Sequence, residues 1–204
     1  MYQKNAWEKY LGEKLNLVMD FNEGYKAFIT KGKTERECVK EAEKIAKAHG
    51  FKNLDDVKEL KKGDKVYVTN KGKNFACFVI GSEKLEKGLR VLGAHIDSPR
   101  LDIKQNPLYE QNNFALLDTH YYGGIKKYQW VTIPLALYGV VCKKDGSVID
   151  VQIGDDKDDP VLGIGDLLIH LSQNQLQKSH EKVFLINAHS CINRSVCPTK
   201  DCKS

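Results

Sequence analysis

The feature that most constrains this chain is an apolar run that leads directly into a histidine and an acid. Residues Leu89–Ala94 are apolar from Val91 onward, with no polar alternation before Gly93, and His95 and Asp97 follow at once. A short apolar run of this kind predicts a strand that is buried on both faces, as in the centre of an α/β sheet. Open α/β sheets place their sites at the carboxyl ends of such strands, and His95 and Asp97 lie there.

The spacing of His95 and Asp97 predicts a partial metal site. Alternate side chains of an extended segment point to the same side, so the two residues face the same way if the strand conformation continues. A neutral imidazole is a good zinc ligand, and a nearby carboxylate can orient the ring. Zinc needs three or four protein ligands, and this pair supplies at most two. The spacing alone equally fits a hydrogen-bonded turn histidine, which is the more common origin of a His-x-Asp pair.

Two helices are expected before this strand. Apolar residues recur at helical spacing over residues 6–30, and Gly24 is the expected break. The second helix has a clearer start, because Thr34 and Glu37 have the spacing of a capping box, and Gly50 is expected to end it. His49, just before Gly50, is interpreted as a helix-end residue.

Two hairpins are expected in the rest of the chain. Residues 65–69 and 74–80 flank a turn that contains Gly72, and residues 130–142 and 148–153 flank an Asp-Gly dipeptide. The acidic loop 155–159 has no spaced calcium-binding frame, which favours a solvated loop over a calcium site.

Composition limits the classes of function. The chain has 204 residues with 41% hydrophobic content, enough for one large or two small globular domains. Its net charge is +5, and the basic side chains are scattered among acidic ones instead of forming a stripe, which argues against nucleic-acid binding. The longest apolar run, 130–142, is too short to cross a bilayer, so no membrane partner is expected. The amino terminus lacks the apolar region of a secretory signal, and we expect a cytoplasmic protein.

The cysteines are expected to be reduced thiols in that compartment. Cys38, Cys77 and Cys142 stand in apolar contexts and are expected in the core. Three more cysteines crowd into the last fourteen residues, where a small metal knuckle with His189 is a minor alternative.

Several motifs together resemble one family of enzymes. Residues Gly93–Arg100 and Asn113–Trp130 resemble the aminopeptidase I and aspartyl aminopeptidase family of two-zinc exopeptidases, and the resemblance includes Gly24–Phe28 and Lys33–Glu37. It continues to about Lys178. The chain is therefore identified as an amino-terminal part of such a protein.

The resemblance implies an α/β fold. Residues 1–101 would be the first part of the zinc-exopeptidase α/β sheet domain, and residues 102–178 the start of a β-rich inserted dimerisation domain, in a truncated chain. Residues 179–204 show no resemblance that we recognise. A shifted reading frame near codon 178 is the favoured explanation, and a genuine short paralogue is the alternative. An incomplete sheet exposes an edge and apolar faces, so poor solubility is expected.

The resemblance also implies roles for individual residues. His95 would bind one of two zinc ions, and Asp97 would fix the geometry around that ion. His170 stands in Leu168–Ser172, which is similar to a Leu-Pro-His-Leu-Ala segment whose histidine reaches the partner subunit's active site and holds substrate. A half-buried, hydrogen-bonded helix histidine is the alternative for His170. His120 is given no catalytic role.

These roles imply a zinc metalloaminopeptidase that removes amino-terminal residues from peptides and assembles as a homo-oligomer. The general base and the remaining zinc ligands are not found in the sequence, so we expect this chain to have little or no activity alone. The alternative is a non-catalytic oligomerisation module that assembles with full-length homologues through the β-rich insertion.

Overall fold

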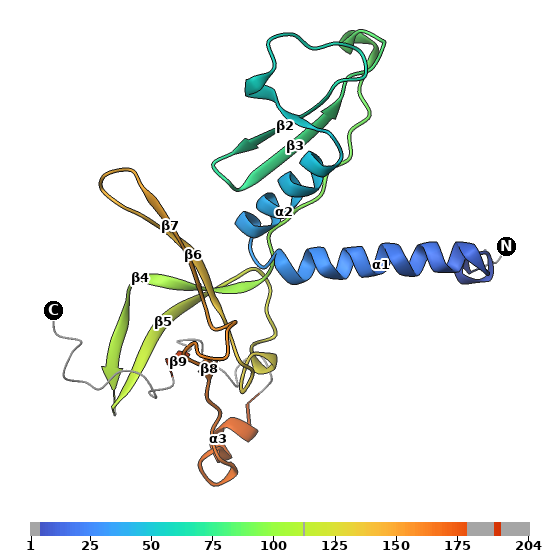
Figure 1. The fold of residues 1–204 in the computed structure, drawn as a ribbon. Coiled ribbons are helices and arrows are strands. Elements are labelled where there is room, and N and C mark those ends of the chain that lie inside the picture. Colours follow the sequence, from blue (N-terminus) through green and yellow to red (C-terminus); the bar gives the residue numbers. More distant parts are fainter. Residues whose placement is uncertain (1–4, 112, 179–189, 193–204) are drawn as a thin grey trace. The chain divides into compact units, whose positions relative to one another are not determined.

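The computed structural model describes residues 5–111, 113–178 and 190–192 (Figure 1). The chain divides into two compact units, Met1–Ser98 (unit 1) and Pro99–Ser204 (unit 2).

Unit 1 begins with a 3-10 turn, η1 (Ala6–Glu8), and a long helix, α1 (Glu13–Lys31). The prediction that Gly24 breaks this helix is wrong, because α1 continues through it. A glycine inside a helix costs only about 1 kcal/mol relative to alanine, which the other residues of α1 offset. No residue of α1 is buried. Among the described residues, no helix is long and apolar enough to cross a membrane.

The second helix, α2 (Glu35–Ala48), starts at the predicted capping box. The Thr34 hydroxyl oxygen accepts a hydrogen bond from the Arg36 amide at 3.3 Å, and the Glu37 carboxylate accepts one from the Thr34 amide at 3.2 Å. His49, the interpreted helix-end residue, caps the carboxyl end of α2, and its Nδ1 lies 2.9 Å from the Ile45 carbonyl oxygen. Gly50 follows with a φ of +82°, a conformation that favours glycine.

A three-stranded sheet completes unit 1. Its order is β1 (Lys52–Asn53), β2 (Lys65–Asn70) and β3 (Asn74–Val79), with η2 (Leu54–Asp56) between the first two strands. The predicted hairpin of β2 and β3 is confirmed. Lys71 and Gly72 both have positive φ, and the Lys73 amide donates to the Asn70 carbonyl oxygen at 3.0 Å. This is the turn geometry that matches the twist of a two-residue hairpin.

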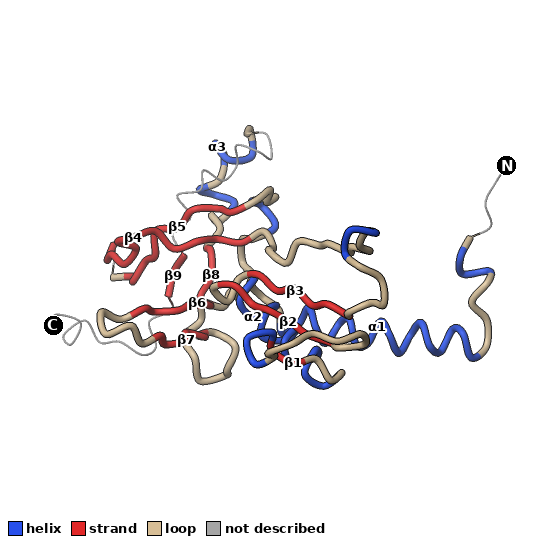
Figure 2. Tube along the Cα trace, turned by 90° about the horizontal axis from the view of Figure 1, so that it is seen from above, coloured by secondary structure: helices blue, strands red, loops and turns tan. Residues whose placement is uncertain are grey.

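Helix α2 lies beside this sheet (Figure 2). The buried apolar residues of unit 1 come from both layers: Cys38, Val39, Ala46, Val66 and Tyr67. Polar contacts hold the same layers together at two places. The Arg36 Nη1 donates to the Lys71 carbonyl oxygen at 3.2 Å, and the Tyr67 hydroxyl donates to the Glu43 carboxylate at 2.9 Å.

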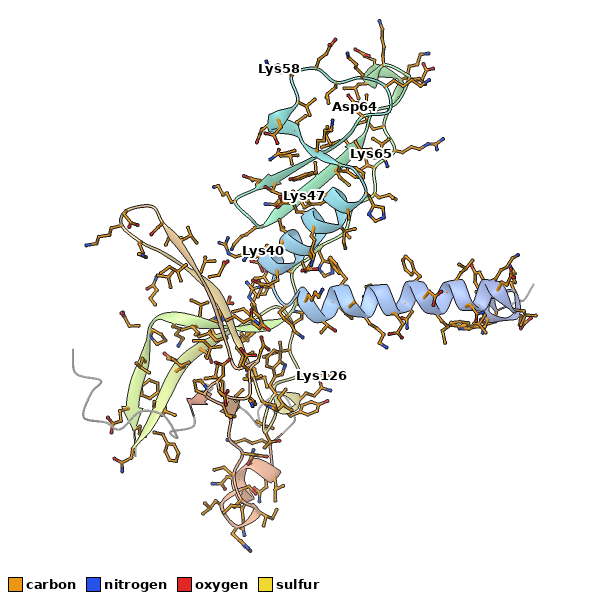
Figure 3. The ribbon with its side chains drawn as sticks, in the orientation of Figure 1. Lys40, Lys47, Lys58, Asp64, Lys65 and Lys126 are labelled. Carbon is orange, nitrogen blue, oxygen red and sulfur yellow. The ribbon has the colours of Figure 1, made fainter. Side chains whose placement is uncertain are left out.

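Glu43 also pairs with Lys47 at 2.8 Å, a residue labelled on α2 in Figure 3. Hydrogen bonds from Lys47 and Tyr67 hold the pKa of the Glu43 carboxyl below its ordinary value, because both favour the charged form.

Unit 2 is built mainly from antiparallel strands. One sheet has the order β4 (Arg100–Gln111), β5 (Phe114–Tyr122), β9 (Ser190–Ile192) and β8 (Leu162–Ile164). The register of β4 against β5 shifts between Ile103 and Leu108, which marks an irregularity in β4. Among the side chains that are described in this sheet, the buried ones are Leu116, Leu117, Thr119 and Leu162.

The second predicted hairpin is also confirmed, as β6 (Leu137–Cys142) and β7 (Val148–Ile153). Its first strand, which η4 (Lys127–Gln129) precedes, is shorter than expected because residues 130–136 form irregular chain around Pro134. Hydrogen bonds from Ser147 hold the pKa of Asp145 below its ordinary value.

One carboxylate of the acidic loop 155–159 stabilises the turn that follows β7. The Asp159 carboxylate accepts hydrogen bonds from the Gly154 amide at 2.7 Å and the Asp156 amide at 3.2 Å, so it closes the turn after β7. The chain then passes β8 to η5 (Ile169–Leu171) and α3 (Gln173–Leu176).

The predicted buried strand at Leu89–Ala94 is wrong. These residues form no strand, Val91 is 79% exposed, and Leu92 is fully exposed. A buried strand needs hydrogen-bonded neighbours and a layer on each face, and the strands described in unit 1 pair only with one another. The apolar composition of Leu89–Ala94 favours burial between two covering layers, and the described chain does not provide those layers.

Of the three cysteines expected in the core, only Cys38 is buried, and burial raises the pKa of its thiol. Cys77 and Cys142 are exposed, which corrects the prediction. Each lies on a strand of a small hairpin, where alternate side chains face solvent. His189 lies outside the described residues, as does almost all of the 179–204 tail.

Candidate metal site

The candidate metal site lies in the segment between unit 1's last 3-10 turn, η3 (Leu85–Lys87), and β4, which forms neither helix nor strand. His95 Nδ1 lies 3.0 Å from the Asp97 backbone carbonyl oxygen and 3.2 Å from the Asp97 carboxylate oxygen Oδ1. The side chain of His95 is 84% exposed, and that of Asp97 is 42% exposed. The structure therefore brings together the two residues that the sequence paired.

These contacts assign the proton of the imidazole ring. Both partners of Nδ1 are acceptors, so Nδ1 carries the hydrogen in the neutral ring. The lone pair on Nε2 is then available for a metal ion. A histidine that donates one ring N–H to a carboxylate or carbonyl and offers the other nitrogen is the usual arrangement around protein-bound zinc.

The described chain does not complete the ligand set. Over residues 5–111, 113–178 and 190–192, no group of three or more His, Cys, Asp or Glu side chains could hold a metal ion. The pair fits one zinc ligand with its orienting carboxylate, and a bound zinc ion needs at least two further protein ligands.

His170 lies in unit 2, on η5, and its side chain is exposed. The alternative of a half-buried helix histidine therefore does not match its position. Neighbouring polar contacts hold this turn: Asp166 Oδ1 accepts hydrogen bonds from the Leu167 amide at 2.8 Å and the Gln175 side chain at 3.2 Å. Ser172, which is buried, donates to the Ile169 carbonyl oxygen at 3.0 Å. His170 and His95 belong to different units.

A polar and aromatic cluster at the start of β4 was missed by the sequence analysis. Arg100 pairs with Tyr122, and Asp102 with His120, in the β4–β5 register. The Arg100 guanidinium lies 4.0 Å from the centre of the Tyr122 ring, and its Nε donates to Asp102 at 2.7 Å. Arg100 and Asp102 are two residues apart on β4, and His120 and Tyr122 are two residues apart on β5. This spacing was the sequence signal that places all four side chains on one face of the sheet. His120 is part of this framework.

Comparison with known proteins identifies the family. The sequence model of Peptidase_M18, described as aminopeptidase I zinc metalloprotease (M18), matches residues 28–202. The chain belongs to this family of zinc metalloproteases. The match continues past Lys178, the point at which the sequence analysis found that the resemblance stops.

Individual relatives agree with this assignment. A probable M18 family aminopeptidase 1 of Clostridium acetobutylicum is 54% identical over 184 residues, which cover 88% of this chain and 40% of the relative. The crystal structure of an M18 aminopeptidase of Thermotoga maritima matches with a TM-score of 0.84 and 42% identity, over 94% of this chain and 41% of that one. The α/β fold class is thereby confirmed.

A more distant match shows the fold alone. The structure of the mApe1 dodecamer of S. cerevisiae matches with a TM-score of 0.63 and 20% identity, over 85% of this chain and 38% of that one. The present chain spans about 40% of the length of the curated relative it matches at 54% identity, and the large majority of its own residues belong to the shared fold.

Proposed function

We propose that this chain carries one zinc ligand, His95, of an M18 aminopeptidase site, and that Asp97 holds the imidazole in the metal-binding tautomer. The observation that carries the proposal is the pair of contacts from His95 Nδ1 to Asp97, at 3.0 and 3.2 Å, on an exposed imidazole. Family membership supports zinc as the metal.

The proposed reaction is the removal of amino-terminal residues from peptides. In the complete site, two zinc ions would supply the positive charge that activates water and polarises the scissile carbonyl. His95 would bind one of them through Nε2, and Asp97 would keep the ring oriented and raise its basicity as a ligand. The general base and the other ligands would come from the part of the relatives that this chain does not span.

His170 is proposed to contact substrate in a neighbouring subunit of a homo-oligomer, with residues 102–178 forming part of the dimerisation domain. Its exposure on a turn that Asp166 and Gln175 hold in place supports this role, because a residue that reaches a partner must be both accessible and well positioned.

We propose that the chain alone does not turn over substrate. To test the role of His95, zinc can be titrated into the full chain and three variants, and the histidine ring nitrogens followed by NMR, because a partial ligand set binds too weakly for competition with a chelator. We expect His95→Ala to remove the site and Asp97→Ala to weaken it about 10-fold, in line with the usual effect of an orienting carboxylate. His49→Ala is the matched control, because His49 is an exposed histidine that contacts a backbone carbonyl and should leave zinc affinity unchanged.

The same proteins loaded with zinc or cobalt can be assayed for hydrolysis of aminoacyl anilides. Sustained turnover that is abolished by His95→Ala would refute the proposed inactivity. Zinc affinity that is equal in the His95→Ala and His49→Ala variants would refute the ligand role.

A second candidate is a non-catalytic module that joins full-length homologues through unit 2. The antiparallel sheets of unit 2, which form in the described chain, support this candidate. Mixing the chain with the intact Clostridium acetobutylicum relative and measuring co-elution tests it: a stable complex would favour the module, and separate elution would reject it.

A further inference from the structure

The segment that carries His170 depends on polar contacts for its shape. It runs from Asp166 through η5 to α3, and these two elements have three and four residues. Helical turns this short are not stable on their own, because the first turn fixes several backbone dihedrals for each hydrogen bond that it forms. No residue of η5 or α3 is buried, so apolar packing of these residues does not account for their order.

Asp166 joins the two ends of this segment. Its Oδ1 accepts a hydrogen bond from the Leu167 amide at 2.8 Å, where the segment begins, and one from Gln175 Nε2 at 3.2 Å, nine residues away from Asp166 along the chain. The loop between these partners contains η5. One carboxylate oxygen therefore holds both connections of the turn on which His170 stands.

The turn itself is closed by other bonds. The Leu171 amide donates to the Leu168 carbonyl oxygen at 2.8 Å, and the buried Ser172 hydroxyl donates to the Ile169 carbonyl oxygen at 3.0 Å. These bonds set the backbone of η5, whereas Asp166 sets where the turn lies between its two connections. A group that meets substrate needs both, because a misplacement of about 1 Å can cost about 100-fold in rate.

We propose that Asp166 is a positioning residue for His170 and that it acts as a hydrogen-bond acceptor. The assignment rests on the function proposed above for His170, which is contact with substrate in a neighbouring subunit. Asp166 touches no substrate in this scheme and keeps the imidazole in one place. Both of its partners, a backbone amide and a side-chain amide, are neutral donors, so the oxygen atom matters here and the negative charge does not.

The test combines amide hydrogen exchange of the full chain with NMR relaxation of its 13C-labelled histidine rings. Asp166→Ala should lower the order of the His170 ring and speed amide exchange at residues 167–172 about 10-fold, because two hydrogen bonds are lost. Asp166→Asn should stay within about 3-fold of the wild type, since an amide oxygen accepts the same bonds. Asp158→Ala, at an exposed position of the acidic loop, is the matched control and should change neither measurement.

A double-mutant cycle tests the contact itself. Gln175→Ala removes one of the two partners of Asp166 and should speed exchange less than Asp166→Ala does. The double variant should exchange no faster than Asp166→Ala alone, because both changes remove the same contact. Exchange in β4 and β5 should be unchanged in all of these variants, which separates a positioning role from a general loss of stability.

Four results would each overturn the assignment. These are an unchanged His170 ring in Asp166→Ala, an Asp166→Asn variant that exchanges as fast as Asp166→Ala, additive effects in the double variant, and loosening of β4 and β5 together with the turn.

The substrate role of His170 is measured separately. The tagged chain is mixed with the intact Clostridium acetobutylicum relative, and hydrolysis of an aminoacyl anilide by the purified mixed oligomers is followed. We expect His170→Ala and Asp166→Ala each to lower kcat/KM relative to the wild-type chain. Equal kcat/KM with His170→Ala would reject the substrate role, and separate elution would reject the proposed assembly. Neither result alters what exchange and relaxation in the chain alone show for Asp166.

Discussion

The packing of unit 1 predicts a large difference between two valines of the same hairpin. Val66 on β2 is 2% exposed and is the largest fully buried side chain among the described residues, whereas Val79 on β3 is 64% exposed. Val66→Ala removes two methyl-sized groups from a buried position at about 0.8 kcal/mol each, or about 1.6 kcal/mol before any cavity cost. Val79→Ala changes the same groups where solvent already reaches them.

The assay is amide hydrogen exchange of the full chain, read on peptides that cover β2 and β3. A loss of about 1.6 kcal/mol corresponds to about 15-fold faster exchange through global opening of unit 1. The same substitution at Val79 should change exchange by less than about 3-fold, since surface changes are usually within about 0.5 kcal/mol. The loss of β-propensity is similar at the two sites, so their difference isolates burial.

Equal effects at both valines would refute this reasoning, because they would show that strand propensity and not packing dominates. A change at Val66 below about 0.5 kcal/mol would show that unit 1 opens at β2 without exposing its core.

Three further predictions concern other contacts. Gly154→Ala should destabilise the turn after β7 by more than about 1 kcal/mol, measured by amide exchange, because Gly154 has a φ of +106° and an added Cβ would lie 2.9 Å from the Leu135 carbonyl oxygen. The pKa of Glu43 is lowered in the folded chain, so the ionised carboxylate stabilises the fold above the ordinary carboxyl pKa, and this stabilisation is lost as pH falls through the lowered pKa. Tyr67→Phe removes one of the hydrogen bonds to this carboxylate. It should therefore cost more stability at pH 7 than in acid, measured by urea unfolding. Cys38 should react slowly with iodoacetamide at pH 8, followed by mass spectrometry of its peptide, because burial raises its thiol pKa and blocks access.

Each of these predictions has a control within the chain. Gly139→Ala should be tolerated, since nothing lies within 4 Å of an added Cβ there. Tyr25→Phe alters an exposed tyrosine of α1 and should give no pH-dependent loss. Cys77 and Cys142, both exposed, should react faster than Cys38. A pH-independent effect of Tyr67→Phe would contradict the role of its hydrogen bond to Glu43. A Gly154→Ala variant of unchanged stability would contradict the close approach to Leu135. Equal alkylation of Cys38, Cys77 and Cys142 would contradict the burial of Cys38.

The elements that formed as predicted have their determinants close together in the sequence. The capping box of Thr34 and Glu37 lies within one helical turn, and the hairpin at Lys71 and Gly72 depends on the φ values of the turn itself. The prediction at Gly24 was wrong because neighbouring helix formers outweigh one glycine.

The sequence by itself determined the family and the pairing of His95 with Asp97, because local motifs and a two-residue spacing are properties of the chain alone. Only the tertiary structure decided what surrounds them. Leu89–Ala94 has the composition of a buried strand, yet burial requires neighbouring strands and covering layers, and the described chain leaves this segment exposed. The same dependence on distant partners explains why His95 and Asp97 form a partial ligand set in the described residues.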